Sequence, residues 1–249
     1  MTQPVARSIF QRVTLDTSGG AGVTPTSPGA GVGPDYHTIR DHYERCLAEH
    51  GPTPKGVDWP NAPDLATRFD VMLSVLRPTP KRPAVLDLGC GPGLLLDHLR
   101  VTQRPNALAY TGVDLSLPMI EAAKRLWPDA QFYQRDILEQ PFADQSFDYV
   151  IMNGVLTEKQ SLSEAAMTAY AEHLIEAAFR SCRIGIAFNV MSAHVDWRRD
   201  DLFHWPFDAL AGFLKARVTR HVTFHADYGL YEYTVYAYRT ASSPTPSFG

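Results

Sequence analysis

The fold of this chain is decided by one short stretch, Val85-Leu86-Asp87-Leu88-Gly89-Cys90-Gly91-Pro92-Gly93. An apolar run ends there in three alternating glycines, and a helical pattern follows. This order predicts a buried strand that passes through a tight turn into a helix. Glycine suits such a turn because the backbone bends sharply and a ligand can lie against bare amides. The stretch therefore predicts a ligand site at the carboxyl end of a strand.

The flanking sequence alternates short β-type runs with helical patterns, which predicts βαβ units and a parallel sheet. We expect parallel strands at Ala84–Leu88, Ala109–Asp114, Gln131–Arg135, Phe147–Met152 and Ile184–Val190. Two later runs, Arg217–His225 and Tyr231–Arg239, are joined by a link too short for a parallel crossover, so this pair must be antiparallel. The predicted fold class is α/β, a doubly wound and mostly parallel seven-stranded sheet with an antiparallel C-terminal hairpin.

Helices fit between these strands. We expect them at Tyr36–His50, at Pro63–Leu76, from the cap Ser116 to about Leu126, from the capping-box spacing Ser161–Glu164 to about Arg180, and at Phe207–Lys215. Residues 1–34 are rich in Gly, Pro, Ser and Thr, which predicts a flexible N-terminal tail. We expect an N-terminal helical lid at 35–80, the ligand-binding domain at 81–240, and a flexible C-terminal tail at 241–249.

Composition narrows the function classes. The formal net charge of −4 argues against a nucleic-acid partner, which usually requires a basic stripe. The apolar runs are too short to span a bilayer, so we expect no membrane partner. Cys46, Cys90 and Cys182 are an odd number of cysteines without metal-binding spacing, which favours reduced thiols and a cytoplasmic location.

An acidic residue precedes the glycines, and a second one ends the next strand. Asp114 follows the turn by about 20 residues, where a carboxylate can take both hydroxyls of a ribose. A dehydrogenase is the main competing interpretation of such a turn. Asp87 disfavours it, because a carboxylate beside the glycines repels a dinucleotide pyrophosphate but attracts an amino group or a sulfonium.

At this point the sequence resembles the class I S-adenosylmethionine (SAM) dependent methyltransferases of the small-molecule type. Their first motif, an apolar strand with an acidic residue and GxGxG, matches Leu86–Gly93. The second matches Gly112–Ser116 and continues into Pro118–Ile120, the third resembles Gln134–Ile137, and the fourth resembles Phe147–Asn153. The resemblance implies a Rossmann-like fold and SAM as cofactor.

By that resemblance, Gly89, Gly91 and Gly93 line the methionine and ribose portions of SAM. Asp87 contacts its amino end, directly or through water, and Asp114 holds the ribose hydroxyls.

The resemblance also places Leu115 on the adenine ring and Asp136 and Ile137 at the adenine edge. Asn153 ends the fourth strand, where the donor faces the acceptor. Because an amide is a poor ligand for a hard cation, we expect no metal there.

The acceptor side is less determined. Tyr36, Tyr43 and Trp59 fall in a region that often caps the cofactor in this family, and for Trp59 ordinary packing is the alternative interpretation. Arg68 either clamps the SAM carboxylate or pairs with Asp64 on its own helix.

Two residues are candidates for a general base. His194 follows the fifth strand, and imidazole titrates near neutrality, but a solvated loop histidine is the alternative interpretation. Glu158, shortly after Asn153, is the second candidate.

We therefore expect a methyltransferase that acts on an oxygen or nitrogen of a small molecule, such as a carboxylate, a sugar derivative or a natural-product intermediate, as a monomer or homodimer. A catalytically idle SAM-binding module and a protein or RNA methyltransferase are the alternatives.

Overall fold

The computed structural model describes residues 36–59, 61–104 and 106–242. Its sheet has the strand order β3-β2-β1-β4-β5-β8-β7, and a short strand β6 pairs with β5. The strands are β1 (Ala84–Leu88), β2 (Ala109–Asp114), β3 (Gln131–Gln134), β4 (Phe147–Met152), β5 (Cys182–Ser192), β6 (His204–Trp205), β7 (His221–His225) and β8 (Glu232–Tyr238). Among these strands, only β8 runs antiparallel to its neighbours β5 and β7. The predicted mixed α/β fold, with a mostly parallel sheet and an antiparallel C-terminal pair, is confirmed.

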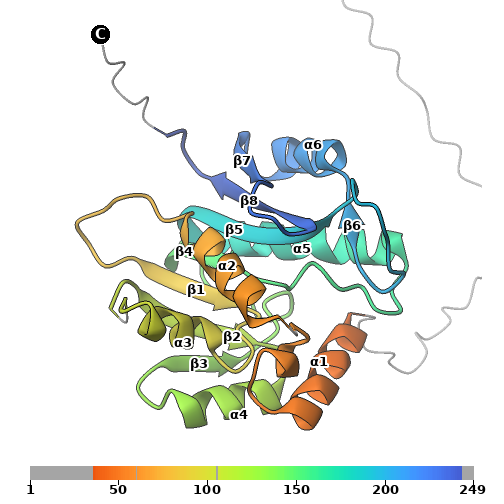
Figure 1. The fold of residues 1–249 in the computed structure, drawn as a ribbon. Helices are drawn as coiled ribbons and strands as arrows, with labels where there is room; N and C mark the ends of the chain where they lie inside the picture. Colours follow the sequence, from red (N-terminus) through yellow and green to blue (C-terminus); the bar gives the residue numbers. More distant parts are fainter. Residues whose placement is uncertain (1–35, 60, 105, 243–249) are drawn as a thin grey trace, which may run out of the picture. The chain divides into compact units, whose positions relative to one another are not determined.

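The helices cover both faces of this sheet. They are α1 (His37–His50), a 3₁₀ turn η1 (Lys55–Val57), α2 (Ala62–Leu73), α3 (Leu94–Val101), α4 (Leu117–Leu126), α5 (Glu164–Ser181) and α6 (Phe207–Arg217). In Figure 1 the orange α2 crosses in front of the sheet, and α5 lies behind it. No helix in the described part of the chain is long and apolar enough to cross a membrane.

The central strands are apolar along their whole length because both of their faces are buried. Neighbouring residues of β1 show this clearly: Val85 packs into the core beneath α2 and α3, whereas Leu86 packs into the core beneath α5. Both side chains are fully buried. The sheet is therefore a rigid central layer, and its carboxyl-terminal edge is free to carry a site.

One helix cap agrees with the prediction from the sequence, and a second one differs from it. The hydroxyl of Ser116 accepts a hydrogen bond from the backbone N–H of Met119, as a cap should. In α5 the cap is Ser163, whose hydroxyl accepts from the N–H of Ala166, and not the expected Ser161. The expected capping-box spacing was therefore wrong by two residues, because both serines precede the same helical pattern.

Two boundaries near the C-terminus also differ from expectation. Helix α6 continues through Arg217, so β7 starts only at His221. Strand β6 has two residues, His204 and Trp205, and was not expected because so short a strand leaves no alternating pattern. The predicted tail at 1–34 and all but the first two residues of the predicted tail at 241–249 lie outside the described residues. The predicted lid at 35–80 and the predicted domain at 81–240 belong, as far as described, to one compact unit.

Candidate functional site

The glycine turn begins the site at the carboxyl end of β1. Gly89 has φ 76°, in the region that favours glycine, and a Cβ added there would lie 2.4 Å from Cγ2 of Val155. Gly91 leaves its backbone N–H turned toward β2. Both glycines line a cavity at this edge of the sheet. Gly93 does not line it: it caps α3 and packs against Trp127, so its role here is structural.

Asp114 ties this turn to the next helix from the end of β2. Its Oδ2 accepts a hydrogen bond of 2.9 Å from the N–H of Gly91, and its Oδ1 accepts one of 2.9 Å from the N–H of Ser116. Burial raises the pKa of the Asp114 carboxyl, and these two N–H donors act in the opposite direction. Asp114 and the adjacent Leu115 both line the cavity.

Asp87 lies in β1, just before the glycine turn. It is only 4% exposed, and its Oδ2 accepts a hydrogen bond of 2.8 Å from the hydroxyl of Tyr110. Burial raises the pKa of Asp87 to about 7. The Asp87 side chain is not among those that line the cavity, so it supports the glycine turn from beneath.

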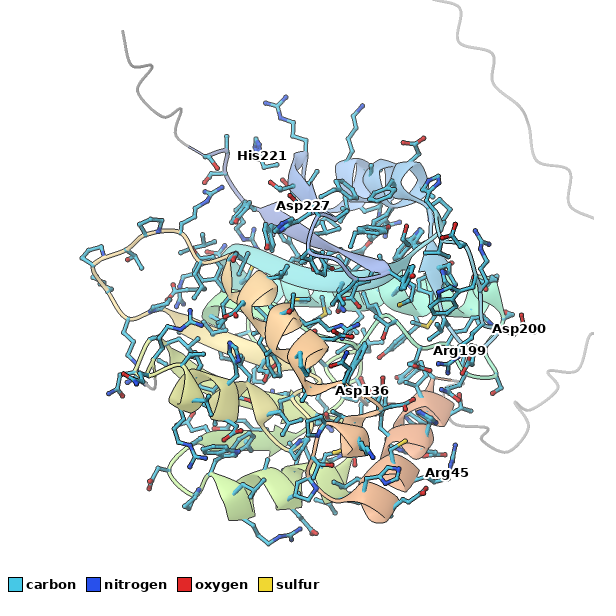
Figure 2. All side chains as sticks on the ribbon, in the orientation of Figure 1. Arg45, Asp136, Arg199, Asp200, His221 and Asp227 are labelled. Carbon is cyan, nitrogen blue, oxygen red and sulfur yellow. The ribbon has the colours of Figure 1, made fainter. Side chains whose placement is uncertain are left out.

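Asp136 and Ile137 extend the cavity wall from the end of β3. Oδ2 of Asp136 accepts a hydrogen bond of 2.7 Å from the hydroxyl of Tyr36, and Figure 2 shows Asp136 beside α1. The Tyr36 ring stacks on Tyr170 of α5, with centroids 4.6 Å apart. Burial, followed by the hydrogen bond to Asp136, raises the pKa of the Tyr36 hydroxyl, which therefore stays protonated and donates.

Asn153 directly follows the end of β4 and also lines the cavity. Its Oδ1 is buried and has no hydrogen-bond partner among the described residues. The next residue, Gly154, donates its N–H to Oδ1 of Asn189 at 2.7 Å. An unsatisfied buried acceptor beside a cavity is a position that a ligand donor can complete.

The cavity holds about 870 Å³ of empty space, part of it open to solvent. Residues from α1, η1 and the following loop cover it from above, and these are Tyr36, Ile39, Arg40, Tyr43, Val57 and Trp59. The three predicted substrate residues, Tyr36, Tyr43 and Trp59, are thus brought to the same cavity as the glycine turn.

Arg68 requires a correction. It neither lines the cavity nor pairs with Asp64: its Nε lies 2.9 Å from both carboxylate oxygens of Glu232 in β8. Both side chains are almost fully buried. The guanidinium also covers one face of Trp59, with its central carbon 3.7 Å from the ring centre. Its charge is already matched, so Arg68 is not available to clamp a cofactor carboxylate.

The two predicted bases lie in different environments. His194 is exposed, stacks on Phe207 at 5.8 Å and is not among the cavity-lining residues. Glu158 is buried, and burial raises its pKa to about 7, with the nearby Asp58 acting in the same direction. Glu158 does not line the cavity either, but it interacts electrostatically with Tyr43, which does.

Several cavity residues were missed by sequence reasoning. Among them are Arg40, Met119, Arg135, Val155, Tyr170 and Leu174. Tyr170 and Leu174 belong to the apolar face of α5, whose spacing indicates only that the face is buried. A helical stripe carries no signal that separates a core contact from a cavity wall.

Comparison with known proteins gives a consistent result. Residues 85–183 match the family model described as "Methyltransferase domain". The Mycobacterium tuberculosis protein named "Putative methyltransferase Rv1506c" is 30% identical over 154 residues, which are 61% of this chain and 90% of that protein. The malonyl-[acyl-carrier protein] O-methyltransferase of Legionella pneumophila is 35% identical over 105 residues, 40% of this chain and 34% of that enzyme. This chain therefore spans about a third of the second relative.

Among solved structures, the 1,6-didemethyltoxoflavin-N1-methyltransferase of Burkholderia thailandensis superposes with a TM-score of 0.57. The match covers 86% of this chain and 93% of that one, at 19% sequence identity. Its crystals contain S-adenosylhomocysteine and 1,6-didemethyltoxoflavin. At this identity the likeness is one of fold.

Proposed function

Because this chain belongs to the class I SAM-dependent methyltransferases, we propose that it transfers the methyl group of SAM to an oxygen or nitrogen atom of a small-molecule acceptor. The observation that carries the proposal is the convergence of three strand ends on one covered cavity. Gly89 from β1, Asp114 from β2 and Asn153 from β4 all line it. In open α/β sheets, ligands bind at the carboxyl ends of strands on either side of a switch in winding direction, here between β1 and β4.

The residues that line the cavity suit the chemistry of SAM. The backbone of Gly89 lines the cavity, and because the residue has no side chain Val155 can pack closely against it. The carboxylate of Asp114 keeps acceptor capacity beyond its two backbone partners, so it can hold ribose hydroxyls. The unsatisfied Oδ1 of Asn153 offers an acceptor for an ammonium or a hydroxyl donor. We assign Leu115 and Ile137 to the apolar walls around adenine and Asp136 to its edge.

When bound, SAM supplies a sulfonium-activated methyl group. The chain's contribution is then to orient the acceptor and to exclude water. Tyr36, Tyr43 and Trp59 are placed for this task because they cover the cavity from the α1 side. Residues 36–59 act as the lid in this proposal, and the acceptor lies between them and the end of β4.

A hydroxyl acceptor also needs a group that takes its proton. Of the two candidates we favour Glu158, which does not line the cavity itself but acts electrostatically on the lining residue Tyr43, over His194, which stacks on Phe207 at the surface. Glu158→Gln should lower turnover more than SAM affinity. His194→Ala is the matched control and should leave both unchanged.

The acceptor class is supported by chemistry and by one relative. The Legionella pneumophila relative acts on malonyl-[acyl-carrier protein], a carboxylic acid derivative. Arg135 lines the cavity and can hold an anionic acceptor, whereas Arg40 lines it too but is paired with Asp41. Carboxylates therefore come first among the acceptors to be tried, followed by sugar derivatives and natural-product intermediates.

Two experiments test the proposal. Calorimetry with SAM, S-adenosylhomocysteine and NAD should show binding of the first two only. The variant Asp114→Asn should lose about 2–3 kcal/mol of SAM binding free energy. Incubation of the chain and SAM with a metabolite library should then yield a product heavier by one CH₂ unit. Binding of SAM without any methylated product would instead support the idle SAM-binding module, and a labelled protein or RNA would redirect the assignment to a macromolecule.

A further inference from the structure

A second cluster of polar side chains lies beside the lid, between α1 and the turn that follows η1. His42 and Cys46 are four residues apart on α1, so their side chains share one face of the helix. Asp58 ends η1 and approaches them from the side. Nε2 of His42 lies 2.9 Å from Oδ2 of Asp58 and 3.7 Å from Sγ of Cys46. All three ligand atoms lie within 4.8 Å of one another, and all three residues are half-buried.

We propose that His42, Cys46 and Asp58 form a binding site for Zn²⁺ or a similar thiophilic divalent ion, which ties α1 to the turn before Trp59. Imidazole nitrogen, thiolate sulfur and carboxylate oxygen are the three donor types that proteins use for zinc. With metal–ligand bonds of about 2.0–2.3 Å, a tetrahedral ion places its ligand atoms about 3.4–3.6 Å apart. The distances of 2.9 and 3.7 Å lie on either side of that value, and the sulfur of Cys46 is no more than 4.8 Å from the Asp58 carboxylate, so side-chain adjustments can bring the three atoms to one ion.

An ordinary ion pair accounts for only part of this arrangement. The contact between His42 and Asp58 explains two of the three side chains, but it leaves the sulfur of Cys46 aimed at the same imidazole nitrogen. A bound ion would use all three donors at once and would leave a fourth position for water. The thiol also decides the kind of ion, because sulfur and imidazole favour zinc over magnesium or calcium.

The surrounding charge favours a cation as well. The carboxylate of Glu158 interacts electrostatically with Asp58 and His42, and it acts on Cys46 too. The cations that act on this cluster are directed elsewhere: Arg45 is exposed and projects outward from α1 in Figure 2, and Arg199 is paired with Asp201.

The proposed metal site lies next to two residues of the lid in the sequence. His42 is followed by Tyr43 and Asp58 by Trp59, and both of these aromatic residues line the cavity. Asp58 also has φ 58°, a left-handed conformation that non-glycine residues rarely adopt. A metal bond at Asp58 would hold that turn in place, so the ion would order the lid without touching the cofactor.

The test uses the full chain without SAM, first stripped with a chelator and then titrated with ZnCl₂ or CoCl₂. We expect one ion per chain, a thiolate-to-cobalt charge-transfer band, and a rise in melting temperature with Zn²⁺. Cys46 should become protected from iodoacetamide, measured on the peptide by mass spectrometry. The Zn²⁺ affinity should fall by about tenfold or more in each of Cys46→Ser, Asp58→Asn and His42→Gln, because one of three protein ligands is lost.

His50→Gln is the matched control, since His50 is an exposed histidine at the end of the same helix. It should leave the Zn²⁺ affinity unchanged. The proposal is overturned if Zn²⁺ gives no protection of Cys46 at micromolar concentrations, or if the control weakens binding as much as Cys46→Ser does. Should a variant fail to fold, the protection of Cys46 in the unaltered chain decides the question alone. None of these readouts involves methyl transfer, so their failure leaves the proposed function standing.

Discussion

The guanidinium of Arg68 lies over the ring of Trp59, with its central carbon 3.7 Å from the ring centre, and its Nε donates to the carboxylate of Glu232. The pair joins α2 to β8, two elements far apart in the sequence, and it is buried. One wall of the cavity thus depends on an ion pair that does not itself reach the cavity. Arg68 is a positioning residue for Trp59.

Removing Arg68 alone should therefore be costly. Arg68→Met leaves the Glu232 carboxylate buried without its partner, which typically costs about 3–5 kcal/mol of unfolding free energy. The double variant Arg68→Met/Glu232→Met should regain most of that loss, because apolar residues of similar size can replace a buried pair. Urea denaturation measures both. SAM affinity should stay reduced in both variants, because Trp59 has lost its support. Full affinity in the double variant would refute the positioning role.

The unsatisfied oxygen of Asn153 leads to an unusual expectation. In the ligand-free chain, a buried acceptor without a partner costs about 1–3 kcal/mol. Asn153→Leu should therefore stabilise the ligand-free chain by about 1 kcal/mol and at the same time lower its affinity for SAM. Thermal melting and calorimetry on one preparation check both parts. Asn189→Leu is the contrast: its Oδ1 accepts from the N–H of Gly154, so its loss should destabilise the chain. Loss of stability in Asn153→Leu would mean that the oxygen already has a partner.

A methyl group at Gly154 should disturb the lid. Gly154 has φ 80°, and an added Cβ would lie 2.9 Å from Cζ2 of Trp59. Gly154→Ala should lower SAM affinity and destabilise the chain by about 1–3 kcal/mol through backbone strain. Gly212→Ala is the matched control, because a Cβ there meets nothing within 4 Å and the residue lies inside α6. The control should stabilise by about 0.5–1 kcal/mol and leave SAM binding unchanged. Equal effects of the two changes on SAM would contradict the contact with Trp59.

The raised pKa of Asp87 makes the stability of the ligand-free chain depend on pH. Burial raises this pKa to about 7, whereas an unfolded aspartate titrates near about 3.9. Between these values the folded chain binds more protons than the unfolded chain, so its stability falls as pH rises and levels off above pH 7.

Asp87→Asn should remove that part of the profile while still accepting the hydrogen bond from Tyr110. At about pH 8 the variant should exceed the wild type by up to a few kcal/mol, since one pKa unit corresponds to about 1.4 kcal/mol. Denaturation at several pH values measures this, with the exposed Asp144→Asn as a control that keeps the wild-type profile. A wild-type profile in Asp87→Asn would show that the carboxyl is not protonated in the folded chain.

The elements that sequence predicted best are those whose patterns are local. The bounds of β1, β2 and β4 agree with expectation, because each is an apolar run that ends at a turn or a polar residue. The same locality explains why the residues of the glycine turn and the strand ends could be assigned: strand ends in a parallel sheet meet at one edge.

What could not be predicted depends on partners distant in the chain. Arg68 was expected either to clamp the SAM carboxylate or to pair with nearby Asp64, whereas its partner Glu232 lies 164 residues away. His194 follows the correct strand, but no pattern tells whether a loop side chain turns toward the site or, as here, onto Phe207. The face of α5 that carries Tyr170 was recognised as buried, yet whether it meets core or cavity depends on how α1 covers the strand ends.

The place of β8 between β5 and β7 has a consequence for how the chain is made on the ribosome (Figure 1). Translation delivers β5 first, and its edge along Gly185–Met191 gains its partner only when residues 232–238 have been made. Strand β7 is made earlier but pairs with β8, so it cannot protect that edge in the meantime. The nascent chain therefore carries an open, apolar strand edge, the feature that recruits other chains into aggregates. Chains that stop before Glu232 should collect as insoluble material even though every glycine of the cofactor turn has already been synthesised.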